Sequence, residues 1–182
     1  MAAVQTDAPE ATQRTLRIAA RALGKAGLAH AYGHCSVRLD SGHFLVCAPE
    51  PMLTIEPGEP GTVVATEGEL PEGVLGEVRI HQQIYLRRPD IGAVCRIMPP
   101  RIMSLSTQGV SPLLRHGLSA YFSGGAPLWE DPRLLRDDTS ARDLLQFMAD
   151  SRAVIMRGNG AVVVGETIEQ AVTYSWFLED TA

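Results

Sequence analysis

The stretch Val94-Cys95-Arg96-Ile97-Met98-Pro99-Pro100 places a charged side chain inside an apolar run that ends at two prolines. Residues 91–97 predict a strand, and because proline is tolerated in the first turn of a helix, a short helix is expected to follow. Arg96 and Met98 are two positions apart, so their side chains leave the strand on the same face. The stretch therefore predicts one strand face that carries both a guanidinium and a thioether.

Helical and strand patterns alternate around this strand. Apolar residues at helical spacing predict a helix at residues 10–27, and Asp40-Ser41-Gly42 is a tight-turn sequence between two strands. Thr139-Ser140 is expected to cap a helix that runs to residue 150, and Thr167 to cap a last helix. The other expected elements are strands at 35–39, 43–48, 62–66, 118–122, 153–156 and 161–164, and helices at 77–88 and 168–180. This order indicates an α/β fold with a mixed sheet covered by helices.

Length and composition limit the classes of function. The chain is expected to form a single domain at residues 1–182, with a flexible N-terminus at 1–9. A net charge of -5 without a basic block argues against a nucleic-acid partner, which needs its phosphates neutralised. No apolar run approaches the roughly 18 residues of a membrane span, and the N-terminal residues lack the apolar stretch of a signal peptide. We therefore expect a cytoplasmic protein with no membrane partner.

The opening stretch resembles the class II aldolase/adducin family, in which a strand ending in His-x-His-Pro-Pro supplies two zinc ligands. Three other segments match family signatures in the same order: a "GN-SVR" turn, a helix with a glutamate and a histidine one turn apart, and an "RNHG-VVVG" turn. These segments occupy residues 33–38, 77–90 and 155–165. The resemblance covers about residues 16–179 and implies a three-layer α/β/α sandwich with a mostly antiparallel central sheet. It also implies a homo-oligomer, usually a tetramer.

The three zinc-binding positions of that family carry Arg96, Met98 and Asn159 in this chain. Arginine stays protonated and has no lone pair to give a metal, and methionine is a soft ligand that suits copper(I) rather than zinc. We therefore expect no metal site and no other cofactor. The small polar residues that precede the family glutamate and bind phosphate are replaced by Leu75 and Gly76. The expected partner is a small-molecule substrate, anionic in character. A carboxylated ligand or an apolar, aromatic one is favoured over a sugar phosphate.

The resemblance and the residue chemistry together define a candidate site. Glu77 matches the acid/base carboxylate of the family, and His81 lies one turn later on the same helix face. Arg96 would hold an anionic group of the substrate close to where the family holds its cation. The residues expected to bind the substrate are Gly33, His34, Met98, Asn159 and Tyr121. Four of these residues also have a structural interpretation. Glu77 would be an exposed glutamate at the start of a helix, His81 and Tyr121 would be core residues, and Arg96 would pair with Glu77 in an inactive site.

Different classes of function stay open at this point. One is a metal-independent, lyase-like enzyme for decarboxylation or for aldol and retro-aldol chemistry on a small carboxylated or carbonyl substrate. In that hypothesis Glu77 moves the proton and Arg96 holds the anion. Another is a non-catalytic, adducin-like binding or assembly domain, and a third is an isomerase or cyclase of a biosynthetic pathway. The lyase hypothesis predicts that turnover depends on Glu77 and Arg96, whereas a binding or assembly domain has no turnover.

Overall fold

A seven-stranded sheet forms the centre of the molecule. The computed structural model describes residues 8–182, so most of the N-terminus expected to be flexible, residues 1–9, lies outside the described residues. The strand order is β3-β2-β1-β4-β7-β6-β5, and every neighbouring pair is antiparallel except β5 and β6. The strands are β1 (His34–Arg38), β2 (His43–Val46), β3 (Thr62–Ala65), β4 (Ala93–Ile97), β5 (Leu128–Trp129), β6 (Ala153–Met156) and β7 (Ala161–Gly165). The expected mostly antiparallel sheet is confirmed.

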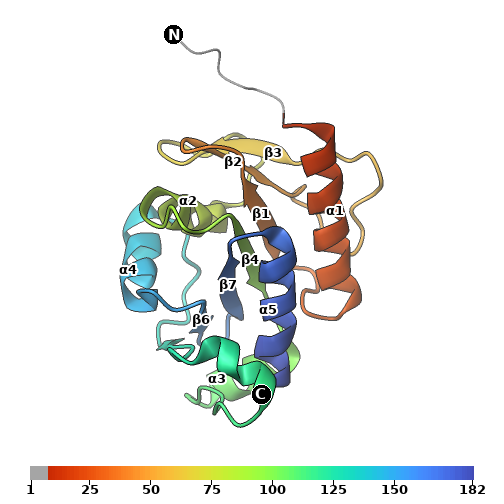
Figure 1. Ribbon diagram of the computed structural model, residues 1–182. Helices are drawn as coiled ribbons and strands as arrows, with labels where there is room; N and C mark the ends of the chain where they lie inside the picture. Colours follow the sequence, from red (N-terminus) through yellow and green to blue (C-terminus); the bar gives the residue numbers. More distant parts are fainter. Residues whose placement is uncertain (1–7) are drawn as a thin grey trace.

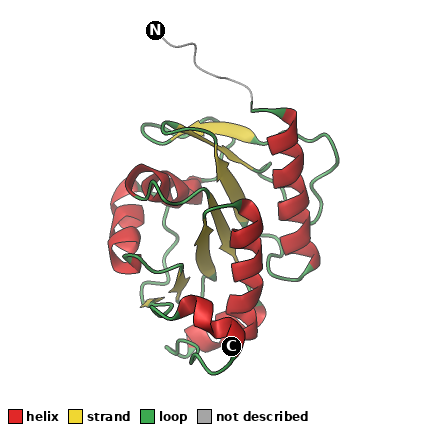
Figure 2. Cartoon of the chain, viewed as in Figure 1, coloured by secondary structure: helices red, strands yellow, loops and turns green. Residues whose placement is uncertain are grey.

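Helices cover both faces of this sheet, as Figures 1 and 2 show. One face carries α1 (Glu10–Lys25), α3 (Pro100–Thr107) and α5 (Ile168–Asp180). The other carries α2 (Arg79–Arg87) and α4 (Asp138–Met148). Each face has its own cluster of buried apolar side chains, because successive residues of a strand point to opposite faces. The expected α/β/α three-layer architecture is confirmed.

Strand β4 lies near the middle of the sheet, between β1 and β7, and shows this alternation clearly. Cys95 and Ile97 belong to the cluster beneath α1 and α5, whereas Val94 belongs to the cluster beneath α2 and α4. Arg96 has the same parity as Val94, so its side chain points toward the α2 layer. Only 1% of Arg96 is exposed to solvent. A cation is therefore buried between the sheet and the N-terminal end of the α2 region.

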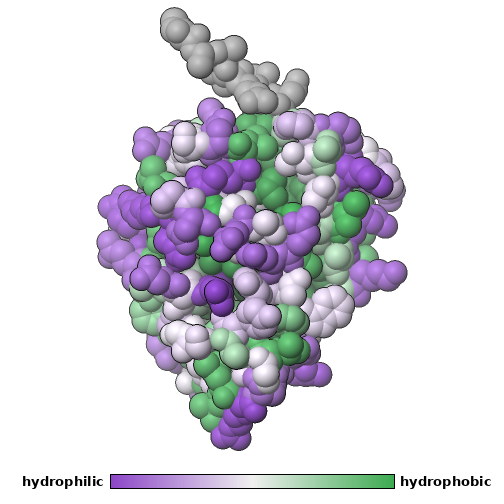
Figure 3. Space-filling view, in the orientation of Figure 1, coloured by the Kyte–Doolittle hydropathy of each residue, from purple (hydrophilic) through white to green (hydrophobic). Residues whose placement is uncertain are grey.

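The surface is mixed in character. Figure 3 shows hydrophilic side chains spread over the viewed face, with apolar residues gathered in smaller patches. Among the helices of residues 8–182, none has both the length and the apolar composition that a membrane span needs. Cys35, Cys47 and Cys95 are free and buried.

The strand expected at residues 118–122 is wrong, because the structure has a 3-10 helix there, η2 (Gly117–Phe122). The His116 side chain accepts a hydrogen bond from the backbone N–H of Leu118, and the Ser119 hydroxyl accepts one from the backbone N–H of His116. These paired bonds satisfy donors at the start of a helical turn. Local capping at His116 therefore outweighs the apolar composition that suggested a strand.

One other expectation from the sequence is wrong, and one short strand has no sequence signal. The N-cap of α4 is Asp137, whose carboxylate accepts from the backbone N–H of Ser140, so the cap expected at Thr139-Ser140 is wrong. The two-residue strand β5, which pairs in parallel with β6, was not expected because two residues give no periodic signal. The Thr167 cap of α5 is confirmed, since its side chain accepts from the N–H of Gln170.

Helix α4 ends on a residue in an unusual conformation, and this generates a prediction about stability. Ala149 has φ 48° and ψ -129°, a region that side-chain-bearing residues rarely adopt. Ala149→Gly should therefore raise the free energy of unfolding by about 1 kcal/mol, measured by urea denaturation. Gln146→Gly, at an exposed interior position of the same helix, should lower it by about 1 kcal/mol. Equal effects of both changes would contradict strain at Ala149.

Candidate active site

A cavity of about 300 Å³ opens where the N-terminal end of the α2 region meets β4. It brings together four of the residues expected at the site, Glu77, Arg96, Met98 and Asn159. Tyr32, Leu134 and Arg136 complete its lining. The cavity thus combines one carboxylate, two guanidinium groups and one amide with three largely apolar side chains.

Arg96 is the centre of the polar contacts in this cavity. Its Nη2 donates to Glu77 Oε1 at 3.3 Å and to Asn159 Oδ1 at 2.6 Å, and its Nη1 donates to the Ile97 carbonyl at 3.2 Å. Glu77 lies in η1 (Gly76–Val78), the 3-10 turn that leads into α2, and is 8% exposed. The pairing of Arg96 with Glu77 that the sequence left open is therefore present. Removing both charges of such a pair from water is costly, and this cost must be offset by good geometry or by a functional role.

The turn between β6 and β7 brings Asn159 to Arg96. Gly160 has φ +72°, and a Cβ added to it would lie 2.0 Å from the Ile97 carbonyl oxygen, so only glycine fits this close approach. Because a guanidinium offers only donors, the Asn159 atom that faces Arg96 must be its carbonyl oxygen. This leaves the Asn159 Nδ2 group without a hydrogen-bond partner among the described residues. The amide is thus oriented by the cation beside it.

Unused hydrogen-bond donors collect around Arg96. Within residues 8–182, three buried side-chain nitrogen or oxygen atoms lack a partner: His34 Nε2, Arg96 Nε and Asn159 Nδ2. The two that belong to cavity residues are obligate donors. A buried donor without an acceptor costs about 1–3 kcal/mol. An oxygen atom of a bound ligand that reached them would recover part of this cost.

The ionisation of Arg96 reflects its surroundings. Burial lowers the pKa of Arg96, whereas the charge of Glu77 and the hydrogen bond to it raise that pKa. Arginine has such a high intrinsic pKa that the side chain remains a cation at neutral pH. Its Nη2 is already shared by Glu77 and Asn159, so the full bidentate fork expected for a substrate carboxylate is not free. What Arg96 offers a ligand is its charge and its unused N–H groups.

The residues at the family's metal positions do not fit a zinc ion. Arg96 donates a hydrogen bond to the Asn159 side-chain oxygen and has no lone pair for a metal, and Met98 offers a soft thioether. Among residues 8–182, no group of three or more His, Cys, Asp or Glu side chains is arranged to hold a metal. A guanidinium, that of Arg96, instead stands at one of the positions that the family resemblance assigns to a metal ligand. The donor chemistry of this site is thus that of an organic cation beside a carboxylate.

A buried hydrogen-bond chain lies behind the cavity. His34 Nδ1 and His81 Nε2 are 2.8 Å apart, His81 Nδ1 lies 2.6 Å from Ser36 Oγ, and Ser36 Oγ lies 2.9 Å from the Tyr85 hydroxyl. His34 and Ser36 come from β1, and His81 and Tyr85 come from α2. His81 is fully buried and does not line the cavity. It therefore links α2 to the sheet.

The direction of this chain follows from counting donors. Burial raises the pKa of Tyr85 above its usual range, so its phenol keeps its proton. If Tyr85 donates to Ser36, Ser36 donates to His81, and His81 donates to His34, a single donor, His34 Nε2–H, is left unused. The opposite direction leaves both the Tyr85 proton and the His34 Nε2 lone pair unused. We therefore assign His34 the tautomer that carries its proton on Nε2.

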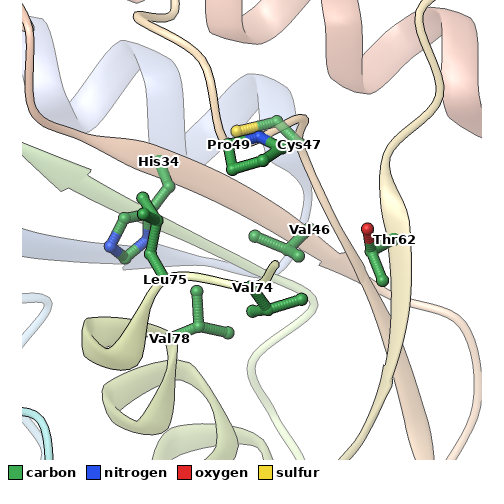
Figure 4. A pocket seen from close by; sticks show the side chains of 8 residues that line it. All are labelled: His34, Val46, Cys47, Pro49, Thr62, Val74, Leu75 and Val78. Atoms are coloured by element: carbon green, nitrogen blue, oxygen red, sulfur yellow. The ribbon is translucent and has the colours of Figure 1, made fainter. Parts of the chain in front are cut away.

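Both histidines are neutral at ordinary pH. Burial, together with a smaller effect of the Arg96 charge, lowers the pKa of His81 to about 3. Burial also holds the pKa of His34 well below its usual range, with smaller contributions from His81 and Arg96. His34 is the cross-strand neighbour of Arg96, and Figure 4 shows its ring at the wall of a separate cavity of about 10 Å³. A positive charge in this region thus comes from arginine and not from imidazolium.

Two further residues expected at the site lie away from the cavity lining. Gly33 precedes β1 and lies close to the backbone carbonyl of Arg96. A Cβ added to Gly33 would lie 3.0 Å from that carbonyl oxygen. Tyr121 is 44% exposed in η2, and its ring packs against Tyr174 and Phe177 of α5. The structure does not bring Tyr121 to Glu77 and Arg96 within the chain.

Comparison with known proteins agrees with this fold. The family model for the class II aldolase and adducin N-terminal domain matches residues 14–182. The chain belongs to this family. An L-fuculose-1-phosphate aldolase from Thermus thermophilus has the same fold, with a TM-score of 0.82 at 24% identity over 95% of this chain and 91% of the aldolase.

Curated relatives within the family are decarboxylases. A 3,4-dihydroxyphthalate decarboxylase from Arthrobacter keyseri is 29% identical over 183 residues, covering 88% of this chain and 71% of the relative. An enzyme of the same name from Rhodococcus jostii is 31% identical over 124 residues, covering 63% of this chain and 50% of the relative. These similarities support a lyase-like or decarboxylase-like function for this member of the family.

The neutral histidine pair predicts a pH dependence of stability. In the unfolded chain a histidine has a pKa of about 6.5, so below that pH the unfolded state binds more protons than the folded state. The free energy of unfolding should therefore fall between pH 7 and pH 5, with a slope that approaches roughly 1.4 kcal/mol per pH unit for each histidine. His34→Asn should make this slope shallower in urea denaturation at several pH values. His30→Asn, at an exposed position, should keep the wild-type slope, and equal slopes in all three proteins would contradict the assignment.

Proposed function

We propose that this chain is a metal-independent decarboxylase of a small hydroxyaromatic acid, with Glu77 as the proton carrier and Arg96 as the stabiliser of negative charge. The supporting observation is the contact between a buried guanidinium and a carboxylate at the wall of one cavity, 3.3 Å apart. A pair of opposite charges in a cleft, beside unused donors, is a typical setting for acid–base chemistry. The names of the decarboxylase relatives support the reaction class.

Arg96 would act on the oxyanion that forms during the reaction. When a carboxylate leaves a ring carbon as CO2, its bonding electron pair must be accommodated, and an adjacent hydroxyl group becomes a phenolate. A fixed positive charge in a site with little water stabilises such an oxygen strongly. Arg96 is held by three hydrogen bonds, so it would need little reorganisation to do so. This is the contribution that a metal cation makes elsewhere in the family.

Glu77 would move one proton between two positions of the substrate. The carboxylate first accepts the proton of the ring hydroxyl and then returns it to the ring carbon that bears the leaving carboxylate. The bond from that carbon to the carboxylate breaks, its electron pair restores the aromatic ring as a phenolate, and CO2 departs. A proton from water then neutralises the phenolate, so the net reaction consumes one proton. Glu77 regains its starting form in each cycle.

The lining of the cavity favours a flat, partly apolar ligand. Tyr32, Met98 and Leu134 supply apolar surface, and about 300 Å³ is enough room for a substituted ring. The chain has Leu75 and Gly76 immediately before Glu77, where the aldolases of the family bind phosphate with small polar side chains. These residues support a carboxylated aromatic ligand over a sugar phosphate.

Replacing either charged residue should impair turnover. Glu77→Gln and Arg96→Met should each lower kcat by at least roughly 100-fold, because one removes the proton carrier and the other the positive charge. The assay is CO2 release from a panel of hydroxylated benzoic and phthalic acids that includes 3,4-dihydroxyphthalate. Glu72→Gln and Arg14→Met change exposed residues of the same types and should keep wild-type rates.

Circular dichroism and thermal denaturation establish that each variant is folded before rates are compared. Unchanged rates in both Glu77→Gln and Arg96→Met would rule out the assigned roles. Absence of CO2 release from every acid by the wild-type protein would instead favour the non-catalytic, adducin-like domain.

Metal independence makes a separate prediction. Dialysis of the purified protein against EDTA should leave kcat within about twofold of its starting value, because Arg96 supplies the charge that zinc would supply. Elemental analysis of the same sample should find less than one transition-metal ion per chain. Loss of activity on dialysis, with recovery after zinc is added, would overturn this part of the proposal.

A further inference from the structure

Arg136 is a second guanidinium at the cavity, and nothing in the proposed reaction uses it. It lies in the loop between β5 and α4 and lines the cavity together with Glu77 and Arg96. The side chain is exposed, unlike that of Arg96, so a ligand can reach it from the mouth of the cavity. Within the cavity, Glu77 offsets one of the two positive charges. The positive charge of Arg136 is therefore not balanced by Glu77.

The neighbours of Arg136 leave its charge without a partner. Within residues 8–182, no carboxylate lies within 4.0 Å of its guanidinium. The charged residues on either side of it in the sequence are engaged elsewhere. Their contacts are Arg133 with Asp131, Asp137 with the backbone and hydroxyl of Ser140, and Asp138 with Arg79. Among residues 8–182 the guanidinium is therefore free to pair with the anion of a bound ligand.

The aliphatic part of Arg136 is held beside the proposed proton carrier. Gly76 directly precedes Glu77, and a Cβ added to Gly76 would lie 3.2 Å from Arg136 Cγ and 3.3 Å from its Cβ. The neighbouring Leu135 is buried in the cluster beneath α2 and α4, which fixes the loop at this point. The stem of Arg136 thus crosses the backbone at the residue before Glu77. Packing of the aliphatic part against Gly76 therefore holds the Arg136 guanidinium near the site, although the residue is exposed to solvent.

We propose that Arg136 binds a second anionic group of the substrate, one that is retained in the product, so that the preferred substrates are aromatic dicarboxylates. The division between a reacting and a retained carboxylate rests on the proposed function. Arg96 has its Nη2 engaged by Glu77 and Asn159, whereas Arg136 keeps its planar fork for a carboxylate. Arg136 then determines specificity and leaves the proton transfer to Glu77.

Binding of simple acids tests this without requiring turnover. The probes are benzoate and the three benzenedicarboxylates, phthalate, isophthalate and terephthalate, titrated into the wild-type protein by calorimetry. At least one dicarboxylate should bind about tenfold or more tightly than benzoate. Arg136→Met should remove that preference, and Arg136→Lys should keep part of it. Arg133→Met, in the same loop but paired with Asp131, is the matched control and should behave like wild type.

The outcomes separate this inference from the proposed function. Equal affinity of the wild type for benzoate and all three dicarboxylates would overturn the role of Arg136. So would an Arg136→Met protein that keeps the preference, or one that loses affinity for benzoate and dicarboxylates to the same extent. In turnover, Arg136→Met should raise KM for a dicarboxylate substrate about tenfold with kcat little changed. Wild-type turnover by Glu77→Gln would overturn the proposed function alone, because the binding data do not depend on it.

Discussion

The buried positive charge of Arg96 on the central strand is the constraint on which the site depends. Transferring a guanidinium out of water is costly unless its hydrogen bonds and its charge are compensated. The compensation comes from three parts of the chain: Glu77 before α2, Asn159 in the β6–β7 turn, and the Ile97 carbonyl on β4 itself. The cation therefore holds a helix start, a turn and a strand together around one cavity.

This arrangement explains how a familiar fold can carry an altered site. The sheet order and the helices on both faces match class II aldolases, because apolar alternation and turn glycines specify them. The chemistry depends on a few side chains that the fold merely positions. In the proposed function, Arg96 supplies as a fixed organic cation the positive charge that a metal ion would otherwise supply. A fixed organic cation takes part through hydrogen bonds and charge, and it cannot exchange ligands.

The sequence contains enough information to predict the site's central elements and too little to predict its rim. Alternation along β4 predicts that Arg96 and Met98 share a face, and the match of Glu77 to a family signature predicts its approach to Arg96. Arg136 gives no such signal, because it reaches the cavity through a loop whose course depends on the burial of Leu135. Tyr32 and Leu134 are likewise placed by the packing of loops. Loop packing is a tertiary effect, so no local pattern encodes it.

The fixed direction of the chain from Tyr85 through Ser36 and His81 to His34 has a consequence for evolution. The phenol at one end decides whether the imidazole at the other presents a proton or a lone pair toward its surroundings. Loss of that hydroxyl, as in a phenylalanine at position 85, would free the chain to reverse. A single change deep in the interior would in this way decide whether the wall of the small cavity beside His34 carries a donor or an acceptor.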